Sequence, residues 1–448
     1  MSKLHVIVVL IFVFSNSLKS QTANTFQFAN LNKRSEKVKF TSVNSLIILP
    51  VEVNGILTNF LVDTGINKTL LFSFQEPNLL NTESLKRVTI KGFGNDEKLY
   101  AYQSKGNQLK IEGLINNNAE LYLFFDNDYN LTNKLGVTIN GIIGYDLLKD
   151  FVVRINYQRN EMKFYQPHKF NRKLTWFDQL PIEFYKNKPY ISSFSEDESL
   201  KKDSLKLLID TGSSDALWLI EGADVKIKQP NFRDVIGYGF AGLVEGYRSQ
   251  LSNFNLGNYQ LSDVNVAYPD ESYFSFLEEV QFRDGSIGSE MMRRFTWFID
   301  YPNQQVFFKA NSEIDAPFVN DMSGLVVKYG GVEVIKRVLP QSVSVNQDTN
   351  YRKNEEDYTS VNVSFEIVNQ LVIEAIRPNS PADLQGLLPE DILLEINGKP
   401  AYTKNLEELT KTLASGHNKK VKLKIKRNNE IFEIDLILKD RLQVEEGK

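Results

Sequence analysis

The chain has 448 residues, a formal net charge of −4 at neutral pH and no cysteine, so disulfides, thiolate metal sites and a cysteine nucleophile are excluded. Its three histidines, His5, His168 and His417, leave almost nothing from which to build a Ser–His–Asp triad or a histidine-rich zinc site. The dispersed Lys and Arg residues give no reason to expect a nucleic-acid partner, and the length corresponds to about three domains.

Residues 1–20 predict a secretory signal peptide. Lys3 supplies a positive start, residues 6–14 form an apolar core, and the residues up to Ser20 are mostly small or polar. The apolar core is too short to span a bilayer, which favours a cleaved signal over an N-terminal membrane anchor. We therefore expect an exported protein, periplasmic or extracellular, that is cut after Ser20. No later stretch reaches about 18 apolar residues, so no stable membrane insertion is expected after cleavage.

Residues 46–62 predict a β-hairpin, because two apolar runs flank the turn signal Asn54-Gly55. The second run ends in Asp63-Thr64-Gly65, and a carboxylate at the end of a buried strand is costly unless it has a partner. The first half of the chain continues with Gly92-Phe93-Gly94, the phrase Gly141-Ile142-Ile143-Gly144 and two predicted strands at 151–155 and 161–165.

The second half of the chain repeats this order. Residues 207–209 are apolar and end in Asp210-Thr211-Gly212-Ser213, 147 positions after the first copy. The repeat continues with Gly237-Tyr238-Gly239-Phe240, Gly285-Ser286-Ile287-Gly288 and predicted strands at 296–300 and 305–309. Such an internal repeat predicts two β-rich lobes related by a pseudo-twofold axis, which would bring Asp63 and Asp210 face to face.

The pair of aspartates predicts acid–base chemistry on a water molecule. Two carboxylates at hydrogen-bonding distance cannot both be ionised at low cost, so they share one proton near neutral to acidic pH. The ionised member can activate water as a general base, while the protonated member donates to a substrate carbonyl. Thr64 and Thr211 are expected to bond the opposite lobe's backbone, and Gly65 and Gly212 to let the backbone pass behind the carboxylates. This chemistry needs neither a metal nor a cofactor.

Glycine-rich tips in the two halves are candidates for substrate binding. Their residues are Gly92, Phe93 and Gly94 in the first half and Tyr238, Gly239 and Phe240 in the second. A hairpin tip that closes over a peptide excludes water and adds backbone hydrogen bonds. Ordinary glycine-rich turns account for the same residues equally well.

The two Asp-Thr-Gly turns, with the later turns Ile142-Ile143-Gly144 and Ser286-Ile287-Gly288, resemble the two lobes of the aspartic protease superfamily. The short lobes resemble the retroviral-type protease unit, here duplicated in one chain, and the resemblance covers residues 40–310. It implies that Asp63 and Asp210 form a catalytic dyad and that peptides or proteins bind between the lobes as substrates.

The two halves depart from this family pattern to different degrees. The residue after the glycine is commonly Ser, Thr or Ala, so Ser213 fits and Ile66 does not. A hydroxyl at that position can bond the nearby carboxylate, which leads to the hypothesis that Asp63, lacking it, is the protonated member. Ser286 is a milder departure, since it replaces an apolar residue. Ile66 also keeps an alternative open, a catalytically inactive protein that binds peptides in the same cleft.

Residues 316–445 predict a third domain with an insertion around 335–362. The resemblance here is to a PDZ domain of the bacterial exported type, and it rests on Ile376 to Ala382, Gly386-Leu387 and Glu390 to Pro400. Glu390 departs from the pattern, which usually has glycine before the aspartate. Such domains add a peptide strand to a sheet edge and hold a C-terminal carboxylate on backbone N–H groups. Ser323, Gly324 and Leu325 are the candidate residues for that loop.

The predicted fold is therefore mainly β, with two pseudo-symmetric aspartic-protease β-barrel lobes at 35–170 and 171–315 and a C-terminal α+β PDZ domain. The predicted function is that of an exported aspartic-type endopeptidase. Its expected partners are a peptide or protein substrate and a PDZ ligand peptide.

Overall fold

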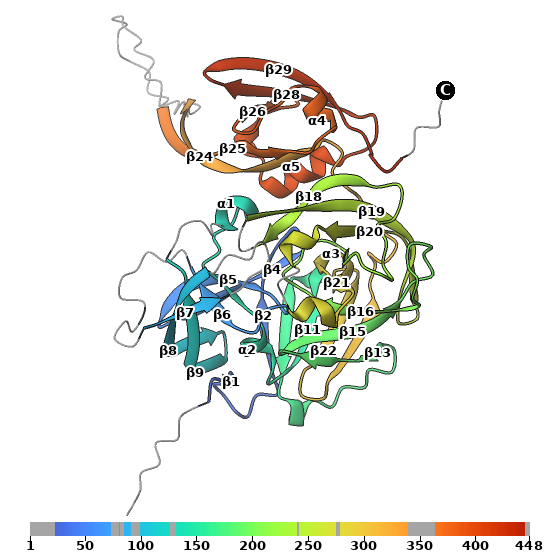
Figure 1. Ribbon diagram of the computed structural model, residues 1–448. Helices are drawn as coiled ribbons and strands as arrows, with labels where there is room; N and C mark the ends of the chain where they lie inside the picture. Colours follow the sequence, from blue (N-terminus) through green and yellow to red (C-terminus); the bar gives the residue numbers. More distant parts are fainter. Residues whose placement is uncertain are drawn as a thin grey trace, which may run out of the picture.

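The computed structural model describes residues 23–72, 80, 85–90, 99–125, 131–239, 242–274, 278–338 and 363–443. The predicted signal peptide, Gly92-Phe93-Gly94, Phe240 and residues 339–362 lie outside these ranges. The described residues form mainly β-strands, as the sequence predicts, and they are arranged in four sheets. A third domain lies above two lobes, close to β18 and α1 (Figure 1). No helix in the described ranges is long and apolar enough to cross a membrane.

The first lobe is built on a nine-stranded sheet that closes on itself, because β8 pairs with both β4 and β9. The turn Asn54-Gly55 joins β4 to β5 as predicted, and both residues have the positive φ that such a turn requires. The strands, in sheet order, are β1 (Gln27–Phe28), β9 (Leu114–Leu123), β6 (Thr69–Leu71), β10 (Gly141–Ile143), β5 (Ile56–Val62), β4 (Leu46–Val53), β8 (Leu99–Ile111) and β7 (Lys86–Ile90), with β3 (Thr41–Val43) beside β4. Helices α1 (Leu131–Leu135) and α2 (Tyr145–Leu148) flank β10.

The second lobe repeats the pairing order of the first. Its eight-stranded sheet closes through the pairing of β15 with β19. The strands, in sheet order, are β14 (Glu183–Tyr185), β15 (Lys188–Phe194), β16 (Ser204–Ile209), β21 (Gly285–Ile287), β17 (Leu217–Leu219), β20 (Tyr259–Pro269), β19 (Gly242–Leu256) and β18 (Phe232–Gly239). The run β5-β10-β6-β9 of the first lobe thus corresponds to β16-β21-β17-β20, with the same parallel and antiparallel pairings. Helix α3 (Ser289–Met292) follows β21, and the 3-10 helices η4 (Glu271–Tyr273) and η5 (Glu278–Phe282) precede it.

A six-stranded antiparallel sheet joins the two lobes, which the sequence analysis does not anticipate. Its centre is the pairing of β11 (Val152–Asn156) with β22 (Phe295–Asp300), one strand from each half. The full order is β13 (Asp178–Pro181), β23 (Gln305–Ala310), β22, β11, β12 (Glu161–Tyr165) and β2 (Ser35–Lys39). One hydrophobic core runs through both lobes and this shared sheet, and it includes the fully buried Trp297, Phe308 and Phe164. The lobes therefore form a single folded body.

The third domain is α+β and has its own core. Helix α5 (Leu406–Leu413) begins at a capping box between Asn405 and Glu408 and buries the three leucines Leu406, Leu409 and Leu413 on one face. The strands, in sheet order, are β24 (Leu325–Val338), β25 (Val363–Ile376), β26 (Ile392–Ile396), β28 (Lys420–Arg427) and β29 (Glu430–Ile437), with β27 (Lys399–Pro400) beside β26 and helix α4 (Pro381–Leu384) after β25. Strand β24 continues through Val338, so residues 335–338 belong to the sheet and not to the predicted insertion.

Candidate active site

Asp63 and Asp210 each stand at the end of a buried strand, in matching environments. The Asp63 N–H donates to the Ile143 carbonyl and the Asp210 N–H donates to the Ile287 carbonyl, both at 2.9 Å. The two Gly-x-Ile-Gly motifs therefore form the strands β10 and β21, which pair with β5 and β16 and hold them in place. Their closing glycines are required by packing, because a Cβ on Gly144 would lie 2.0 Å from the Asp63 carbonyl oxygen.

The two turns are locked together by their threonines. Thr64 Oγ1 donates to the Ile209 carbonyl at 2.5 Å, and Thr211 Oγ1 donates to the Val62 carbonyl at 2.8 Å. Each hydroxyl also accepts the backbone N–H of the other threonine, at 3.0 and 3.1 Å. Both threonines are completely buried. The crossed bonds fix the separation of the two strand ends, as expected for Thr64 and Thr211 from the sequence.

The carboxyl groups of Asp63 and Asp210 meet between the two glycines of the turns. Gly65 N–H donates to Asp63 Oδ1 at 2.7 Å, Gly212 N–H donates to Asp210 Oδ1 at 3.1 Å, and the two carboxyl groups share a hydrogen bond. A Cβ on Gly212 would lie 2.4 Å from Asp63 Cγ. Only glycine leaves room for the opposite carboxyl group at this position.

The pKa values of both carboxyl groups are raised, and Asp63 is favoured as the neutral member of the pair. Burial raises the pKa of Asp63 to about 7, with the charge of Asp210 as the second cause, against the opposing effects of the Gly65 N–H and Lys188. Burial also raises the pKa of Asp210, but the Arg283 guanidinium, the Gly212 N–H and Lys188 oppose this rise. The hydrogen bond between the carboxyl groups favours a neutral Asp63 and an ionised Asp210.

The origin of this asymmetry differs from the sequence-based hypothesis. Ser213 is expected to hydrogen-bond Asp210, but within the described ranges its hydroxyl makes no such bond and lies beside the Gly288 turn. The Ser213 carbonyl accepts the Ser289 N–H at 2.7 Å, which orients the residue toward β21 and α3. Arg283 replaces Ser213 as the group that favours the charged form of Asp210. The sequence places Arg283 before the second Gly-x-Ile-Gly motif but gives no sign that its charge acts on Asp210.

If this dyad hydrolyses peptide bonds, the rate is expected to follow a bell-shaped pH profile. The rate falls as pH rises through about 7, because Asp63 then loses the proton that it would donate. It also falls in acid, because the raised pKa of Asp210 lets this group become protonated at a pH above its ordinary pKa of 3.8. The measurement is kcat/KM of one peptide substrate between pH 3 and 9. A rate that keeps rising to pH 9 would contradict the shared proton.

Tyr238 of the predicted substrate-binding tip contacts the third domain in this structure. Its hydroxyl donates to Glu374 Oε2 of β25 at 2.5 Å, and Lys134 Nζ of α1 lies 3.9 Å from its ring centroid. Gly239 ends strand β18 beside it. The side chain expected to close over a peptide is therefore held between the first lobe and the third domain, while Gly92-Phe93-Gly94 and Phe240 lie outside the described residues.

Removal of the Glu374 carboxylate is expected to loosen the β18–β19 hairpin. Glu374→Ala deletes the acceptor of the Tyr238 hydroxyl, a bond that contributes about 1 kcal/mol, so amide hydrogen exchange in β18 should rise about fivefold. The matched control is Glu366→Ala, which removes an exposed carboxylate from the same strand, where it pairs with Arg337. Equal exchange rates in the two variants would show that Glu374 does not restrain the hairpin.

The predicted carboxylate-binding loop of the third domain is occupied by its own chain. The N–H groups of Ser323 and Gly324 donate to Asp321 Oδ1 at 3.1 and 2.7 Å, and the Leu325 N–H donates to Ser323 Oγ at 3.0 Å. Arg377 also donates to Asp321, at 2.9 Å. All three loop N–H groups are thus satisfied internally, so a peptide carboxylate would have to displace Asp321.

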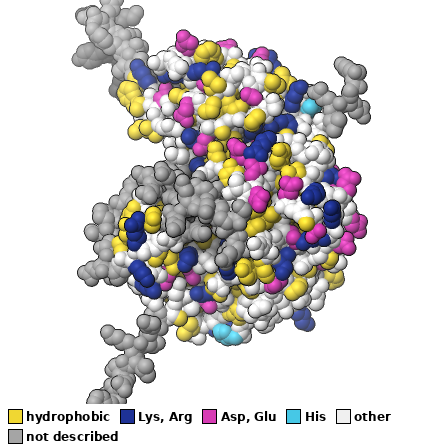
Figure 2. Space-filling model, viewed as in Figure 1, with side chains coloured by type: hydrophobic (Ala, Val, Ile, Leu, Met, Phe, Trp, Pro, Cys, Tyr) yellow, Lys and Arg dark blue, Asp and Glu magenta, His cyan; other side chains and the backbone are white. Residues whose placement is uncertain are grey.

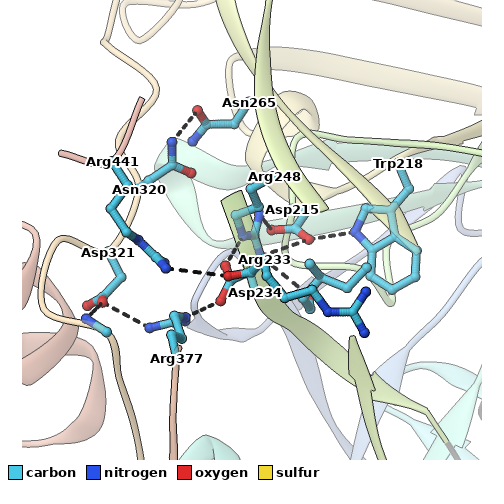
Figure 3. Close-up of polar contacts among 12 residues, drawn as sticks. Asp215, Trp218, Arg233, Asp234, Arg248, Asn265, Asn320, Asp321, Arg377 and Arg441 are labelled. Carbon is cyan, nitrogen blue, oxygen red and sulfur yellow. Dashed lines mark hydrogen bonds and ion pairs between the residues drawn. The ribbon is translucent and has the colours of Figure 1, made fainter. Parts of the chain in front are cut away.

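A buried chain of charges connects this loop to the second lobe. Arg377 pairs with Asp321 and Asp234, Arg248 pairs with Asp234 and Asp215, and the Asp215 carboxylate accepts the Trp218 indole N–H at 2.5 Å. Figure 3 shows Arg377 and Arg248 directed at Asp234, while Arg441 donates to the Arg233 carbonyl at 3.4 Å and adds its positive charge to the cluster. Charged side chains also gather on the visible surface along the junction of the third domain with the lobes (Figure 2). The sequence does not predict this network, because charged residues on a strand ordinarily indicate an exposed face.

A family model described as a PDZ domain matches residues 372–427. The matched segment runs from β25 through α4, β26 and α5 to β28. The chain therefore contains a PDZ domain there, a type of module that binds peptides or proteins. The match does not reach the lobes that carry Asp63 and Asp210.

Proposed function

We propose that this protein is an exported aspartic-type endopeptidase whose PDZ domain recognises peptides or protein chains. The observation that carries the proposal is the dyad: two partly buried carboxyl groups that share a hydrogen bond and have raised pKa values, at strand ends fixed by crossed threonine bonds. Raised pKa values at paired carboxyl groups are typical of sites that use one as acid and the other as base.

In the proposed reaction, Asp210 acts as the base and Asp63 as the acid. The ionised Asp210 takes a proton from a water molecule, whose oxygen attacks the carbonyl carbon of the peptide bond. Asp63 donates its proton to the carbonyl oxygen, which gives a neutral tetrahedral intermediate. Asp210 then passes its proton to the amide nitrogen while Asp63 takes a proton from one hydroxyl group of the intermediate. The C–N bond breaks to give an amine and a carboxylic acid, and the dyad returns to its starting state. Both side chains retain some exposure, which leaves room for water and substrate at the strand ends.

The test is a peptidase assay on purified protein with a mixed peptide pool at pH values from 3 to 8, read by mass spectrometry. Cleavage that is blocked by a statine-type transition-state mimic supports the proposal. Cleavage that the mimic leaves unchanged would point to another active site or to a contaminating protease. Export is tested separately by sequencing the N-terminus of the mature protein, which should begin at Gln21.

The alternative function is a catalytically inactive peptide-binding protein that uses the same cleft and the PDZ domain. Ile66 favours it, because the residue that commonly supports the first aspartate is replaced by an apolar one. The same assay distinguishes the two functions. Peptides that bind but stay intact across the whole pH range would decide for the binding protein.

A further inference from the structure

The peptide groove of the PDZ domain is bounded by strand β24 and helix α5. A PDZ domain adds a peptide strand to a sheet edge and holds the C-terminal carboxylate on backbone N–H groups. Among the described strands β24 is such an edge, and it begins at Leu325, in the loop whose N–H groups already hold the Asp321 carboxylate. Tyr329 of β24 and Leu406 of α5 pack on the same hydrophobic core and face each other across the groove.

Helix α1 of the first lobe occupies one end of this groove. The helix lies next to the PDZ domain and contacts β24 (Figure 1). It ends at Gly136, whose N–H donates to the Thr132 carbonyl at 2.8 Å. A Cβ on Gly136 would lie 2.9 Å from the Tyr329 ring and 3.4 Å from Leu406 Cδ1. Because neighbouring strands of a sheet lie about 4.8 Å apart, no peptide strand fits between Gly136 and Tyr329.

Helix α1 is fixed to the first lobe and not to the PDZ domain. Leu131, Leu135 and Val137 pack against a hydrophobic cluster of that lobe. Thr132 Oγ1 also accepts the Ile139 N–H at 3.1 Å, which holds the segment after the helix. A ligand that enters the groove therefore has to move the PDZ domain away from α1.

The contact that holds strand β18 crosses the same boundary. Tyr238 of β18 donates to Glu374 of the PDZ domain at 2.5 Å, and Lys134 of α1 lies 3.9 Å from the Tyr238 ring centroid. Lys328 of the groove strand β24 lies 3.8 Å from the same glutamate. Movement of the PDZ domain away from α1 therefore also breaks the bond between Tyr238 and Glu374.

We infer that this chain closes its own PDZ groove, and that a peptide with a free C-terminal carboxylate opens it and releases strand β18. The ligand's carboxylate replaces Asp321 on the N–H groups of Ser323 and Gly324, and its strand replaces α1 beside β24. Because the ligand and α1 exclude each other, a change that weakens the α1 contact strengthens ligand binding. The closure does not depend on peptidase activity. Its consequence for cleavage, a β18–β19 hairpin that is free to cover a substrate, rests on the proposed function.

The test measures peptide binding by fluorescence polarisation in the full chain carrying Asp63→Asn, so that the peptides are not cleaved. The probes are a pool of fluorescein-labelled peptides of mixed sequence with a free C-terminal carboxylate, and the same pool amidated at the C-terminus. Asparagine tolerates the positive φ of Gly136 (+76°), so Gly136→Asn keeps the end of α1 but places a side chain against Tyr329. This variant should bind the free-carboxylate pool about tenfold more tightly and the amidated pool as before.

Gly106→Asn is the matched control for this variant. Gly106 lies in the same lobe with a φ of +73°, and nothing lies within 4 Å of its Cβ position, so both pools should bind as they do to the background protein. Asp321→Ala, which leaves α1 unchanged, should also favour the free-carboxylate pool by about tenfold. Circular dichroism shows whether each variant is folded. Binding of the free-carboxylate pool by Gly136→Asn no tighter than by Gly106→Asn overturns the inference, and Asp321→Ala decides in the same way if Gly136→Asn does not fold.

Amide hydrogen exchange tests the release of β18. The peptide of the pool that binds most tightly is added in excess to the chain carrying Asp63→Asn, and it should raise exchange in β18 about fivefold. Its amidated copy should raise exchange nowhere, and β22 of the shared sheet should be unaffected by either peptide. Constant exchange in β18 while the peptide is bound overturns the inference. Neither measurement requires cleavage, so a negative peptidase assay rejects the proposed function and leaves these results to decide the closure.

Discussion

Replacing either Asp63 or Asp210 by asparagine is expected to lower kcat/KM for peptide cleavage by about 10³-fold or more. Asparagine keeps the shape of each side chain and its bond to the turn N–H, at 2.7 Å from Gly65 and 3.1 Å from Gly212 in the wild type. It can neither accept the proton of water at Asp210 nor donate a labile proton at Asp63. Each variant is measured separately, because the loss of either carboxyl group is enough to prevent the two aspartates from sharing a proton.

Stability measurements show whether the dyad variants remain folded. The folded pKa of Asp63 is raised above its ordinary value of 3.8 to about 7, so the stability linked to its neutral form is present below pH 3.8 and is lost as pH rises through about 7. Asp63→Asn cannot ionise, so this variant should unfold at a higher urea concentration than the wild type above pH 7. Asp435→Asn, at an exposed position of β29, is the control and should retain full activity. Full activity in Asp63→Asn or Asp210→Asn would rule out the dyad.

Replacing Arg377 by leucine is expected to destabilise the protein by about 3–5 kcal/mol at pH 7. Arg377 pairs with Asp234 and Asp321, and all three side chains lie at the boundary between the PDZ domain and the second lobe (Figure 3). Removing the cation leaves both carboxylates in a buried place with weaker compensation. Urea unfolding measures the loss, and Arg337→Leu, at an exposed ion pair, should change stability by less than about 0.5 kcal/mol.

The pH dependence of this loss identifies its source. Burial alone would raise the pKa of Asp234, but Arg377, Arg248 and Arg441 outweigh it and lower that pKa. The stability that Asp234 contributes is present above its ordinary value of 3.8 and is lost as pH falls through the lower folded value. The difference between wild type and Arg377→Leu should therefore shrink in acid. A constant difference from pH 3 to 8 would indicate lost packing and not an unpaired charge.

The sequence predicts the local parts of the site well, because its signals are local. The turn at Asn54-Gly55 and the strands that end at Asp63 and Asp210 follow from residue type and spacing. The crossed threonine bonds follow from the internal repeat, since symmetry brings two identical turns together. These features depend on residues that are close in the sequence or on the internal sequence repeat.

The parts that the sequence does not predict depend on contacts between distant segments. The positive charge of Arg283 acts on Asp210 from a different segment of the chain, and Tyr238 meets Glu374 only because the PDZ domain lies against β18. Asp234 looks like an exposed strand residue until three arginines from separate segments surround it. The expected bond from the Ser213 hydroxyl to Asp210 is absent from the described residues, and the hydroxyl lies beside Gly288.

The shared sheet formed by β11 and β22 has a consequence for how the two halves can diverge. Two identical chains that met across such a twofold axis would be obliged to keep every substitution in duplicate. In one continuous chain the two halves can be substituted independently, and the two halves of this protein differ. The charge of Arg283 acts on Asp210, and Glu374 accepts a hydrogen bond from Tyr238 in the hairpin of one lobe. Because the two halves belong to one chain, they can differ in sequence. The protonated aspartate therefore lies in the first half, and the hairpin that contacts the PDZ domain lies in the second.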